Sequence, residues 1–480
     1  MRNRLFTTLP AFLAALALIL SPVTAAHSGM LGPDKMTIRD ENRLGAQFDR
    51  IVRTQMNMVG DTYITTYVDG LVQNVVKAKN PMPFRIKSAV VASPVLNAFA
   101  VPGGYIYIFT GLIQEVTSES QIVGVIAHEL GHVSQRHVAS RMEKQKTVGM
   151  LAMAGVLAGA FIGITGGSGS GKAASAIMAG SQGIATAAML GYSQDDEREA
   201  DHVGMNSLVK AGYNPNGMPE TFELMLKNKW FDSGSSQTPS YLSTHPGLSD
   251  RIVYLKDRIA RMPASFSERK DDNHTLHRVQ VLIRAKLSDA SMAKAYWDNK
   301  PQADYSAMDW IGRGIVLTRL KDQDMAQAAF DKALSMDKED PLVCRETGIF
   351  YFKSGNYSEA FKYLQKAFIK NRKDALGLFY MARIQAESKD YGRAILNMTQ
   401  VLTMVPEDAE VHYHLGMILG ESGDAFHGNI HLAYSAVYSG DQRKASYHRQ
   451  QASTLATTDV QRQELNQLDT VIQQYGKPIG

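Results

Sequence analysis

The fold of this chain is decided by residues 118–132, which read SESQIVGVIAHELGH. The apolar residues of this stretch recur at helical spacing and lead directly into His128 and His132. Ser118, followed by Gln121 three residues later, has the pattern of a capping box, which marks the start of a helix. The stretch therefore predicts an apolar helix that carries two histidines.

The two histidines can share one metal ion. Residues four apart lie on one face of a helix, so His128 and His132 can present both imidazoles to a single cation. Glu129 is rotated by about 100° from His128, which places it beside such an ion, where it can accept a proton from an activated water. Gly131 lets another segment of the chain approach closely.

A hydrolytic zinc site needs a third ligand from elsewhere in the chain. Residues 195–201, DDEREAD, supply a candidate, because Glu197 and Asp201 are four apart on one helical face. Glu197 could bind the metal, and Asp201 could accept a hydrogen bond from a ligand imidazole and fix its tautomer. The spacing fits equally well a solvated acidic helix start, where carboxylates favour the helix dipole.

A small sheet is predicted ahead of the histidine helix. Residues 40–79 have helical spacing and predict one or two helices. Residues 84–91 read as strand, and residues 97–112 read as strand, turn and strand, with Gly103 and Gly104 as the turn.

Three segments together resemble one family. Residues 97–104, NAFAVPGG, then residues 128–132, then residues 197–201 stand in the order found in M48 zinc peptidases. The resemblance implies a mainly α chain that begins with a zincin-like α+β metallopeptidase domain containing a small β-sheet. It also implies that the strand near residues 104–109 can pair with an extended substrate.

The same resemblance assigns roles to individual residues. It implies one Zn²⁺ per chain, with Glu197 rather than Glu199 as the third ligand, because Glu197 stands four residues before Asp201. Glu129 and Asp201 are the implied catalytic residues. The implied metal ligands are His128, His132 and Glu197.

The C-terminal part is a repeat array. Gly314, Gly348, Ala382 and Gly416 are spaced by 34 residues, and other alanine and tyrosine columns keep the same period. This is the tetratricopeptide pattern, which places small residues where paired helices approach. At least three units are expected, with less regular helical flanks, so an all-α tetratricopeptide-repeat solenoid follows the peptidase domain and can bind a protein partner in its concave face.

The N-terminus has the pattern of a secretory signal. Arg2 and Arg4 precede an apolar run, and small residues follow at a cleavage position. An uncleaved anchor is the alternative. The predicted regions are residues 1–25 (signal peptide), 26–268 (M48-like zinc metallopeptidase domain) and 269–480 (helical repeat domain).

Two further segments need interpretation. Residues 148–164 are apolar and could just span a thin bilayer, but their small residues favour a helix packed in the protein or touching a membrane surface. Residues 166–172, GGSGSGK, resemble a phosphate loop, yet Ala173 stands where Ser or Thr should follow. A flexible loop is the better interpretation.

Composition excludes other classes. The net charge of +4 is small and the basic residues are scattered, which argues against nucleic-acid binding. The single cysteine, Cys344, excludes an intramolecular disulfide and is expected to be a buried bystander.

Several other histidines are not expected to bind the metal. His137 lies about 140° round the helix from His132 and is not expected to join the site easily, and His202 is expected to face away. Packed or solvated positions are favoured over a metal site for His412, His414, His427 and His431.

The signal and the repeats make the chain resemble the periplasmic, repeat-bearing branch of M48 peptidases. That resemblance implies misassembled outer-membrane proteins as substrates and the barrel-assembly machinery as a partner of the repeats. In that branch, a histidine matching His245 lies over the zinc, so His245 would be a regulatory fourth ligand that displaces the catalytic water. The alternative is a loop histidine without contacts.

The leading hypothesis is thus a periplasmic zinc endopeptidase for quality control of outer-membrane proteins. A chaperone or assembly scaffold that acts through its repeats, with a latched peptidase site, is the main alternative. A membrane-integral peptidase that uses residues 148–164 as a span is a third.

Overall fold

The computed structural model describes residues 35–78, 82–144, 192–231 and 241–476. The predicted signal peptide, the apolar stretch 148–164 and the Gly-rich loop 166–172 lie outside these residues. Within the described part of the chain, no helix combines the length and apolar character needed to cross a membrane.

A three-stranded sheet of order β1-β3-β2 stands in the N-terminal half. β3 runs parallel to β1 and antiparallel to β2. Gly103 and Gly104 make the tight β2–β3 turn with φ of 79° and 83°, values that glycine adopts without strain. The predicted strand–turn–strand unit is confirmed, although the first strand begins only at Lys87. The bounds are β1 (Lys87–Val91), β2 (Ala98–Val101) and β3 (Tyr105–Phe109).

The prediction that the strand near residues 104–109 receives an extended substrate is wrong. β3 is the central strand, and its backbone pairs with β1 on one side and β2 on the other. An added strand needs unpaired N–H and C=O groups, which only an edge strand offers. On the side facing the histidine helix, that edge is β2.

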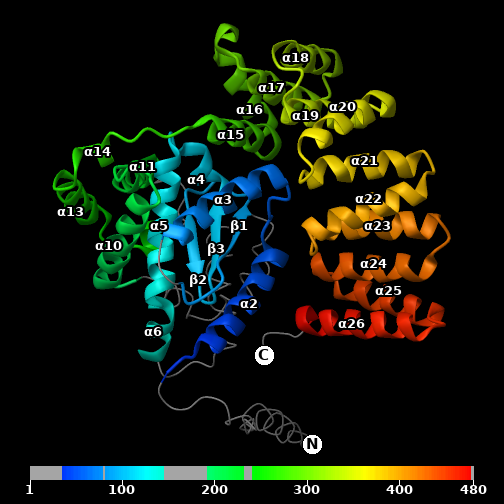
Figure 1. Cartoon of the computed structure of the whole chain (residues 1–480), viewed down its shortest axis with the longest axis horizontal. Helices are drawn as coiled ribbons and strands as arrows, with labels where there is room; N and C mark the ends of the chain where they lie inside the picture. Colours follow the sequence, from blue (N-terminus) through cyan, green and yellow to red (C-terminus); the bar gives the residue numbers. More distant parts are fainter. Residues whose placement is uncertain (1–34, 79–81, 145–191, 232–240, 477–480) are drawn as a thin grey trace, which may run out of the picture.

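Helices cover both faces of the sheet (Figure 1). Phe48 and Val52 of α2 pack on one face against an aromatic cluster that includes Phe99 and Tyr107. The other face packs against α3 and α5, whose apolar residues join the largest core cluster. The bounds are α2 (Ile38–Gln55), α3 (Thr62–Ala78), α4 (Thr110–Glu115) and α5 (Glu119–Gln135).

The histidine helix α5 is buried on all sides, because every residue from Ile122 to Val133 is enclosed. It packs against β2, α10 and α11. The expected close approach at Gly131 is confirmed, since a Cβ there would lie 2.6 Å from the carbonyl oxygen of Ala200 in α10. The surrounding helices are α6 (His137–Lys144), α10 (Gln194–Lys210), α11 (Gly217–Phe231), α12 (Tyr241–Thr244), α13 (Leu248–Ala260) and α14 (Ala264–Ser267).

The predicted capping box at the start of α5 is wrong. The Ser118 side chain makes no capping hydrogen bond. Gln121 instead accepts from the backbone N–H of Thr117 at 2.8 Å, and Asp271 accepts from the backbone N–H of Ser120 at 2.8 Å. A carboxylate distant in sequence therefore satisfies a free donor at this helix start.

The C-terminal region is a stack of antiparallel helix pairs, as predicted. Gly314 lies against the Phe330 ring and Gly348 against Leu364, so the small residues of the 34-residue period are sites of close helix packing. The second helix of each pair starts with an Asp or Asn cap, and these caps recur through a fourth pair, α23–α24. The bounds are α15 (His274–Leu287), α16 (Ala290–Asn299), η1 (Gln302–Asp304), α17 (Ala307–Arg319), α18 (Gln323–Met336), α19 (Pro341–Lys353), α20 (Tyr357–Lys370), α21 (Ala375–Glu387), α22 (Tyr391–Met404), α23 (Ala409–Glu421), α24 (Ala425–Tyr438), α25 (Gln442–Leu455) and α26 (Asp459–Gly476).

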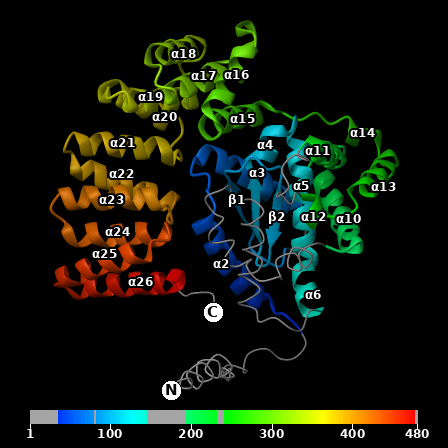
Figure 2. The same ribbon diagram turned by 180° about the vertical axis from the view of Figure 1, so that it is seen from behind.

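The repeat array touches the N-terminal half of the chain at both of its ends, as the two opposite views show (Figure 2). At its start, Gln280 of α15 donates to the backbone oxygens of Ile113 and Val116 at 2.9 and 2.8 Å. At its end, the Arg50 guanidinium of α2 lies 5.8 Å from the ring centre of Tyr475 in α26. The array therefore curves back toward α2.

Replacement of Gly131 by Ala tests the α5–α10 packing. The new methyl group would collide with backbone atoms of Ala200, so we expect a loss of about 1–3 kcal/mol in the free energy of unfolding. Gly70→Ala is the matched control, because a Cβ at this exposed helical position meets nothing within 4 Å, and it should stabilise by about 0.5–1 kcal/mol. Urea unfolding followed by circular dichroism measures both, and a Gly131→Ala protein as stable as the parent would contradict this packing.

Candidate metal centre

Four buried side chains from distant parts of the chain converge. His128 and His132 come from α5, Glu197 from α10, and His245 from the segment after α12. One ligand atom of each lies within 4.8 Å of the others, and each residue is at most 1% exposed. The sequence-predicted ligands and the predicted fourth residue are therefore brought together.

The nitrogen and oxygen atoms of this cluster point at a common centre. Nε2 of His128 lies 3.0 Å from Nε2 of His132 and 3.4 Å from Oε2 of Glu197. Nε2 of His132 lies 3.4 Å from Oε1 of Glu197. Nδ1 of His245 lies 3.0 Å from the same oxygen and 3.3 Å from Nε2 of His128.

The start of α10 explains how Glu197 reaches the cluster. Ser193 and Asp196 form a capping box, with Asp196 N–H donating to the Ser193 hydroxyl and Ser193 N–H donating to the Asp196 carboxylate. This cap sets the helix phase, so that Glu197 and Asp201 face α5. Both carboxylates are 0% exposed, so the alternative of a solvated acidic helix start does not hold for them.

Asp201 holds His128 from behind. Its Oδ1 lies 2.8 Å from Nδ1 of His128, which leaves Nε2 of that ring toward the cluster. Arg251 of α13 donates to both Asp201 oxygens at 2.7 Å and also pairs with Glu197. The Tyr254 hydroxyl donates to Asp201 as well. This second set of contacts fixes the carboxylates and balances their charge.

Glu129 lies beside the cluster, in contact with the edge strand. The backbone N–H of Ala100 in β2 donates to its Oε2 at 3.1 Å. Its Oε1 is buried, has no hydrogen bond within the described residues, and lies 3.5 Å from Nε2 of His245. Glu129 thus has one oxygen held by the backbone and one directed at the space that His245 occupies.

Burial and charge shape the ionisation of the cluster. Burial raises the pKa of the Glu129 carboxyl. Burial opposes ionisation of Glu197 too, but His245 and hydrogen bonds from the other histidines outweigh it and hold its pKa well below the usual range. Burial and Arg251 disfavour a charged His128, yet hydrogen bonds to Asp201 and Glu197 raise its pKa to about 9. The two carboxylates therefore favour positive charge at this centre. A bound divalent cation would supply that charge.

The donor set fits a metal ion. Three imidazole nitrogens and one carboxylate, all enclosed, match the nitrogen and oxygen ligands that zinc accepts in four-coordinate sites. The same donors would bind other first-row metals.

Aromatic rings enclose the cluster, and the sequence did not identify them. The Tyr192 ring stacks on His132 at 3.7 Å between centres, and the Tyr241 ring stacks on His245 at 4.1 Å. The backbone N–H of Tyr192 donates to the carbonyl of Thr244 at 2.9 Å, which ties the approach to α10 to the His245 segment. Tyrosines ahead of α10 and in α12 had no spacing signal that could have linked them to the histidines.

His137 stays outside the four-residue cluster, as expected, but it lies closer to that cluster than its spacing predicted. The prediction assumed that α5 continues, but the helix ends at Gln135, and the next residue, Arg136, has φ of 56°. The chain turns there, and Nδ1 of His137 comes within 2.8 Å of Nδ1 of His132. Nε2 of His137 lies 3.3 Å from Glu199. His137 contacts the back of a candidate ligand as Asp201 does for His128.

The other singled-out residues lie away from the cluster. His202 is exposed, as expected. Cys344 is buried and free, and burial raises the pKa of its thiol to about 11, which fits a bystander. The repeat histidines are packed or ion-paired: His412 with His431 at 2.9 Å, His414 against Phe379, and His427 with Asp424 at 2.7 Å.

Comparison with known proteins finds two family matches in this chain. Residues 62–259 match peptidase family M48, and residues 310–340 match a tetratricopeptide repeat. The beta-barrel assembly-enhancing protease of Escherichia coli is 27% identical over 249 residues, which cover 52% of this chain and 50% of that protein.

Other relatives carry related names. A Vibrio cholerae relative, whose name also refers to beta-barrel assembly enhancement, is 29% identical over 310 residues, covering 64% of this chain and 62% of that protein. The mitochondrial metalloendopeptidase OMA1 of Arabidopsis thaliana is 32% identical over 168 residues, covering 35% of this chain and 30% of that protein. The matched region thus spans between half and two thirds of the two bacterial relatives.

Removal of the His137 imidazole tests its contact with His132. With Nε2 of His132 toward the cluster, its Nδ1–H can donate to His137, which orients the ring. His137→Ala should therefore weaken metal affinity by about 10- to 100-fold, as measured by competition with a chelator. His202→Ala, an exposed histidine on α10, is the control and should bind metal like the parent. Equal affinities for all three proteins would rule out this role.

Proposed function

Because residues 62–259 form a peptidase family M48 domain ahead of tetratricopeptide repeats, we propose that this chain is a zinc-dependent endopeptidase. The observation that carries the proposal is the enclosed cluster of His128, His132 and Glu197, with the Glu129 carboxylate beside it. In this proposal the first three residues hold the ion. Bound zinc would polarise the scissile carbonyl and lower the pKa of water at the site.

Glu129 is the proposed general base and acid. Its free Oε1 accepts a proton from the attacking water, and the protonated carboxyl then donates that proton to the leaving amine. The buried surroundings raise the pKa of this carboxyl, which suits a group that must hold a proton between two steps. Asp201 orients His128 through the 2.8 Å contact at Nδ1.

The edge strand β2 is the proposed substrate-binding strand. It lies next to α5, and its Ala100 N–H points away from β3 toward Glu129. An extended substrate that pairs along this edge would bring its backbone next to the Glu129 carboxylate. This placement replaces the earlier expectation for β3.

Glu129→Gln tests the chemistry. The amide keeps the size of the side chain but cannot take up a proton, so we expect hydrolysis of an unfolded protein substrate to fall at least about a hundredfold. Metal content, measured by atomic emission spectroscopy, should remain that of the parent. Activity close to that of the parent would exclude Glu129 as the base, and chelation of the metal should abolish activity in both proteins.

His245 is the proposed latch of this site. Its ring lies within hydrogen-bond distance of Glu197 and 3.5 Å from Glu129, where the attacking water must act. Stacking on Tyr241 and the Tyr192–Thr244 backbone hydrogen bond hold it there. A peptidase in this state requires movement of the His245 segment before it can bind substrate.

Replacement of His245 by Ala should increase basal proteolysis. If the open state is populated about one part in ten in the parent, loss of the latch raises the rate about tenfold. The readout is cleavage of a quenched fluorescent protein substrate, together with the zinc coordination number from X-ray absorption. His274→Ala, an exposed histidine, serves as the control. An unchanged rate with an unchanged coordination number would refute the latch.

For substrates and location, we propose the periplasm and misassembled outer-membrane proteins. The support is the name of the Escherichia coli relative, the signal-like pattern of residues 1–25, and the repeats, which would bind the barrel-assembly machinery. Proteolysis of the mature chain in spheroplasts but not in intact cells would support the location.

A scaffold or chaperone that acts through the repeats is the second candidate. It is favoured by the closed arrangement of His245 and Glu129. Complementation of a deletion strain by Glu129→Gln distinguishes the two: full rescue would make binding the main function, and no rescue would make hydrolysis essential.

A further inference from the structure

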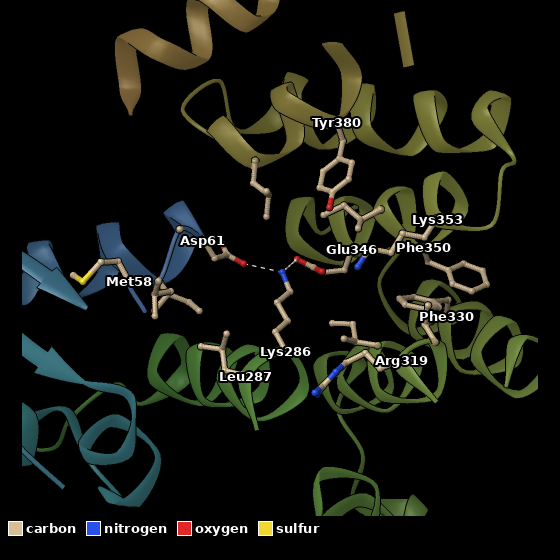
Figure 3. Close-up of a pocket in the computed structure, with 17 residues that line it drawn as sticks. Met58, Asp61, Lys286, Leu287, Arg319, Phe330, Glu346, Phe350, Lys353 and Tyr380 are labelled. Carbon is tan, nitrogen blue, oxygen red and sulfur yellow. Dashed lines mark hydrogen bonds and ion pairs between the residues drawn. The ribbon is translucent and has the colours of Figure 1, made fainter. Parts of the chain in front are cut away.

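A cavity of about 440 Å³ lies between the peptidase domain and the inner helices of the repeats (Figure 3). The segment between α2 and α3 forms one wall, and α15, α17, α19 and α21 form the others. This volume is within the range of protein pockets that bind small ligands. It is separate from the metal centre, since none of the cluster residues lines it.

Much of the cavity wall is apolar. The apolar side chains that form it come from α3, α15, α17, α19 and α21. They include Ile64, Leu287, Ile315, Ile349, Phe350 and Leu376. An apolar side chain that enters would be removed from water on several sides, at about 25 cal/mol for each Å² buried.

The charges on one side of the cavity compensate one another. Nζ of Lys286 lies 2.7 Å from Oδ2 of Asp61 and 2.7 Å from Oε1 of Glu346, as the dashed lines in Figure 3 show. Arg345 behind them pairs with the same two carboxylates and with Asp374. These two cations and three carboxylates leave a net charge of −1, so this cluster creates no demand for a ligand with negative charge.

Lys353 differs from these groups. It lines the cavity at the end of α19, is exposed, and has no ion pair or hydrogen bond among the described residues. Partial loss of water between the cavity walls lowers the pKa of its ammonium group. The carboxylate of Glu346 raises this pKa, whereas the positive charges of Lys286 and Arg319 lower it further. A carboxylate placed here would relieve that unfavourable environment.

A second donor accompanies Lys353. The Tyr380 ring points into the cavity from α21, and its hydroxyl has no hydrogen bond within the part of the chain that the structure describes. By contrast, the guanidinium of Arg319 already donates to the backbone oxygens of Ala285 and Ser288. Lys353 and Tyr380 therefore each present a donor group without a hydrogen bond among the described residues.

The cavity continues in one direction. A neighbouring cavity of about 220 Å³ shares Gly60, Asp61 and Leu376 with it and extends along α21, α22 and α23. Its walls combine the apolar side chains of Phe379, Val401, Val405 and Val411 with the carboxylates of Asp408 and Glu410. The two cavities therefore lie next to each other, with Gly60, Asp61 and Leu376 between them.

We propose that this double cavity binds the C-terminal end of a polypeptide whose last residue is apolar. The terminal carboxylate pairs with Lys353 and accepts a hydrogen bond from Tyr380, the last side chain lies on the apolar wall, and the preceding residues follow the neighbouring cavity. A chain terminus is the simplest group that carries a carboxylate and an apolar side chain on one carbon. In an extended segment, an internal acidic residue and its apolar neighbour point to opposite sides. This site goes beyond the proposed hydrolysis and does not require it.

The test uses the full chain with Glu129→Gln, so that peptides remain intact. A short fluorescein-labelled peptide that ends in Phe with a free carboxylate is compared, by fluorescence anisotropy, with the same peptide carrying a C-terminal amide. The free acid should bind about tenfold more tightly, because a charge-assisted hydrogen bond is lost in the amide. Lys353→Met in the same background should bring the acid to the affinity of the amide and leave the amide unchanged.

Lys332→Met is the matched control, because Lys332 is exposed on α18 and does not line the cavity. It should preserve the difference between acid and amide. Equal affinities of the two peptides, or a difference that survives Lys353→Met, would overturn the proposal and leave Lys353 as a lysine that only favours the helix end. Displacement of a fatty-acid probe that depends on Lys353, without binding of either peptide, would also overturn it, because the occupant would then be a lipid.

Discussion

The structure depends on one constraint, which is that charged groups buried between α5 and α10 must compensate one another. His128, Glu197 and Asp201 are 0% exposed, and an unpaired charge at such depth would be strongly destabilising. Pairing is possible because Gly131 lets the two helix backbones come close. Arg251 from α13 then completes the balance of charge. The sheet packs against α5, the Ser193 cap fixes the start of α10, and the Tyr192 and Tyr241 rings cover the histidines between these helices.

The same constraint acts where the repeats meet the peptidase domain. Asp61 at the start of α3 pairs with Lys286 and with Arg345, both from the C-terminal region. Arg345 is 1% exposed and also contacts Glu346 and Asp374. Removal of one member would leave a buried charge without its partner, which typically costs about 3–5 kcal/mol. Buried charge thus joins the two halves, and the cavity with Lys353 lies beside that junction.

Sequence patterns predicted what depends on local spacing. The histidine helix, the strand–turn–strand unit and the 34-residue repeat each follow from the period of the side chains, and all three are present. Two wrong predictions, the cap of α5 and the free edge of β3, share a cause, since each depended on a contact distant in sequence. The backbone N–H of Ser120 at the start of α5 donates to Asp271, and β3 is a central strand because β1 pairs with its second side. His137 lies closer to His132 than its spacing predicted because α5 ends at Gln135, two residues before it.

By itself, the sequence determined the chemical groups: two imidazoles on one helical face, a carboxylate beside them and a second pair of carboxylates four residues apart. Helical geometry is local, so spacing alone sets which side chains share a face. Only the tertiary structure decided that Glu197 is buried at the same centre, that His245 lies over it and that Lys353 faces a cavity. These placements depend on the packing of helices from distant segments, because burial and the compensation of charge are properties of the assembled core and have no period along the chain.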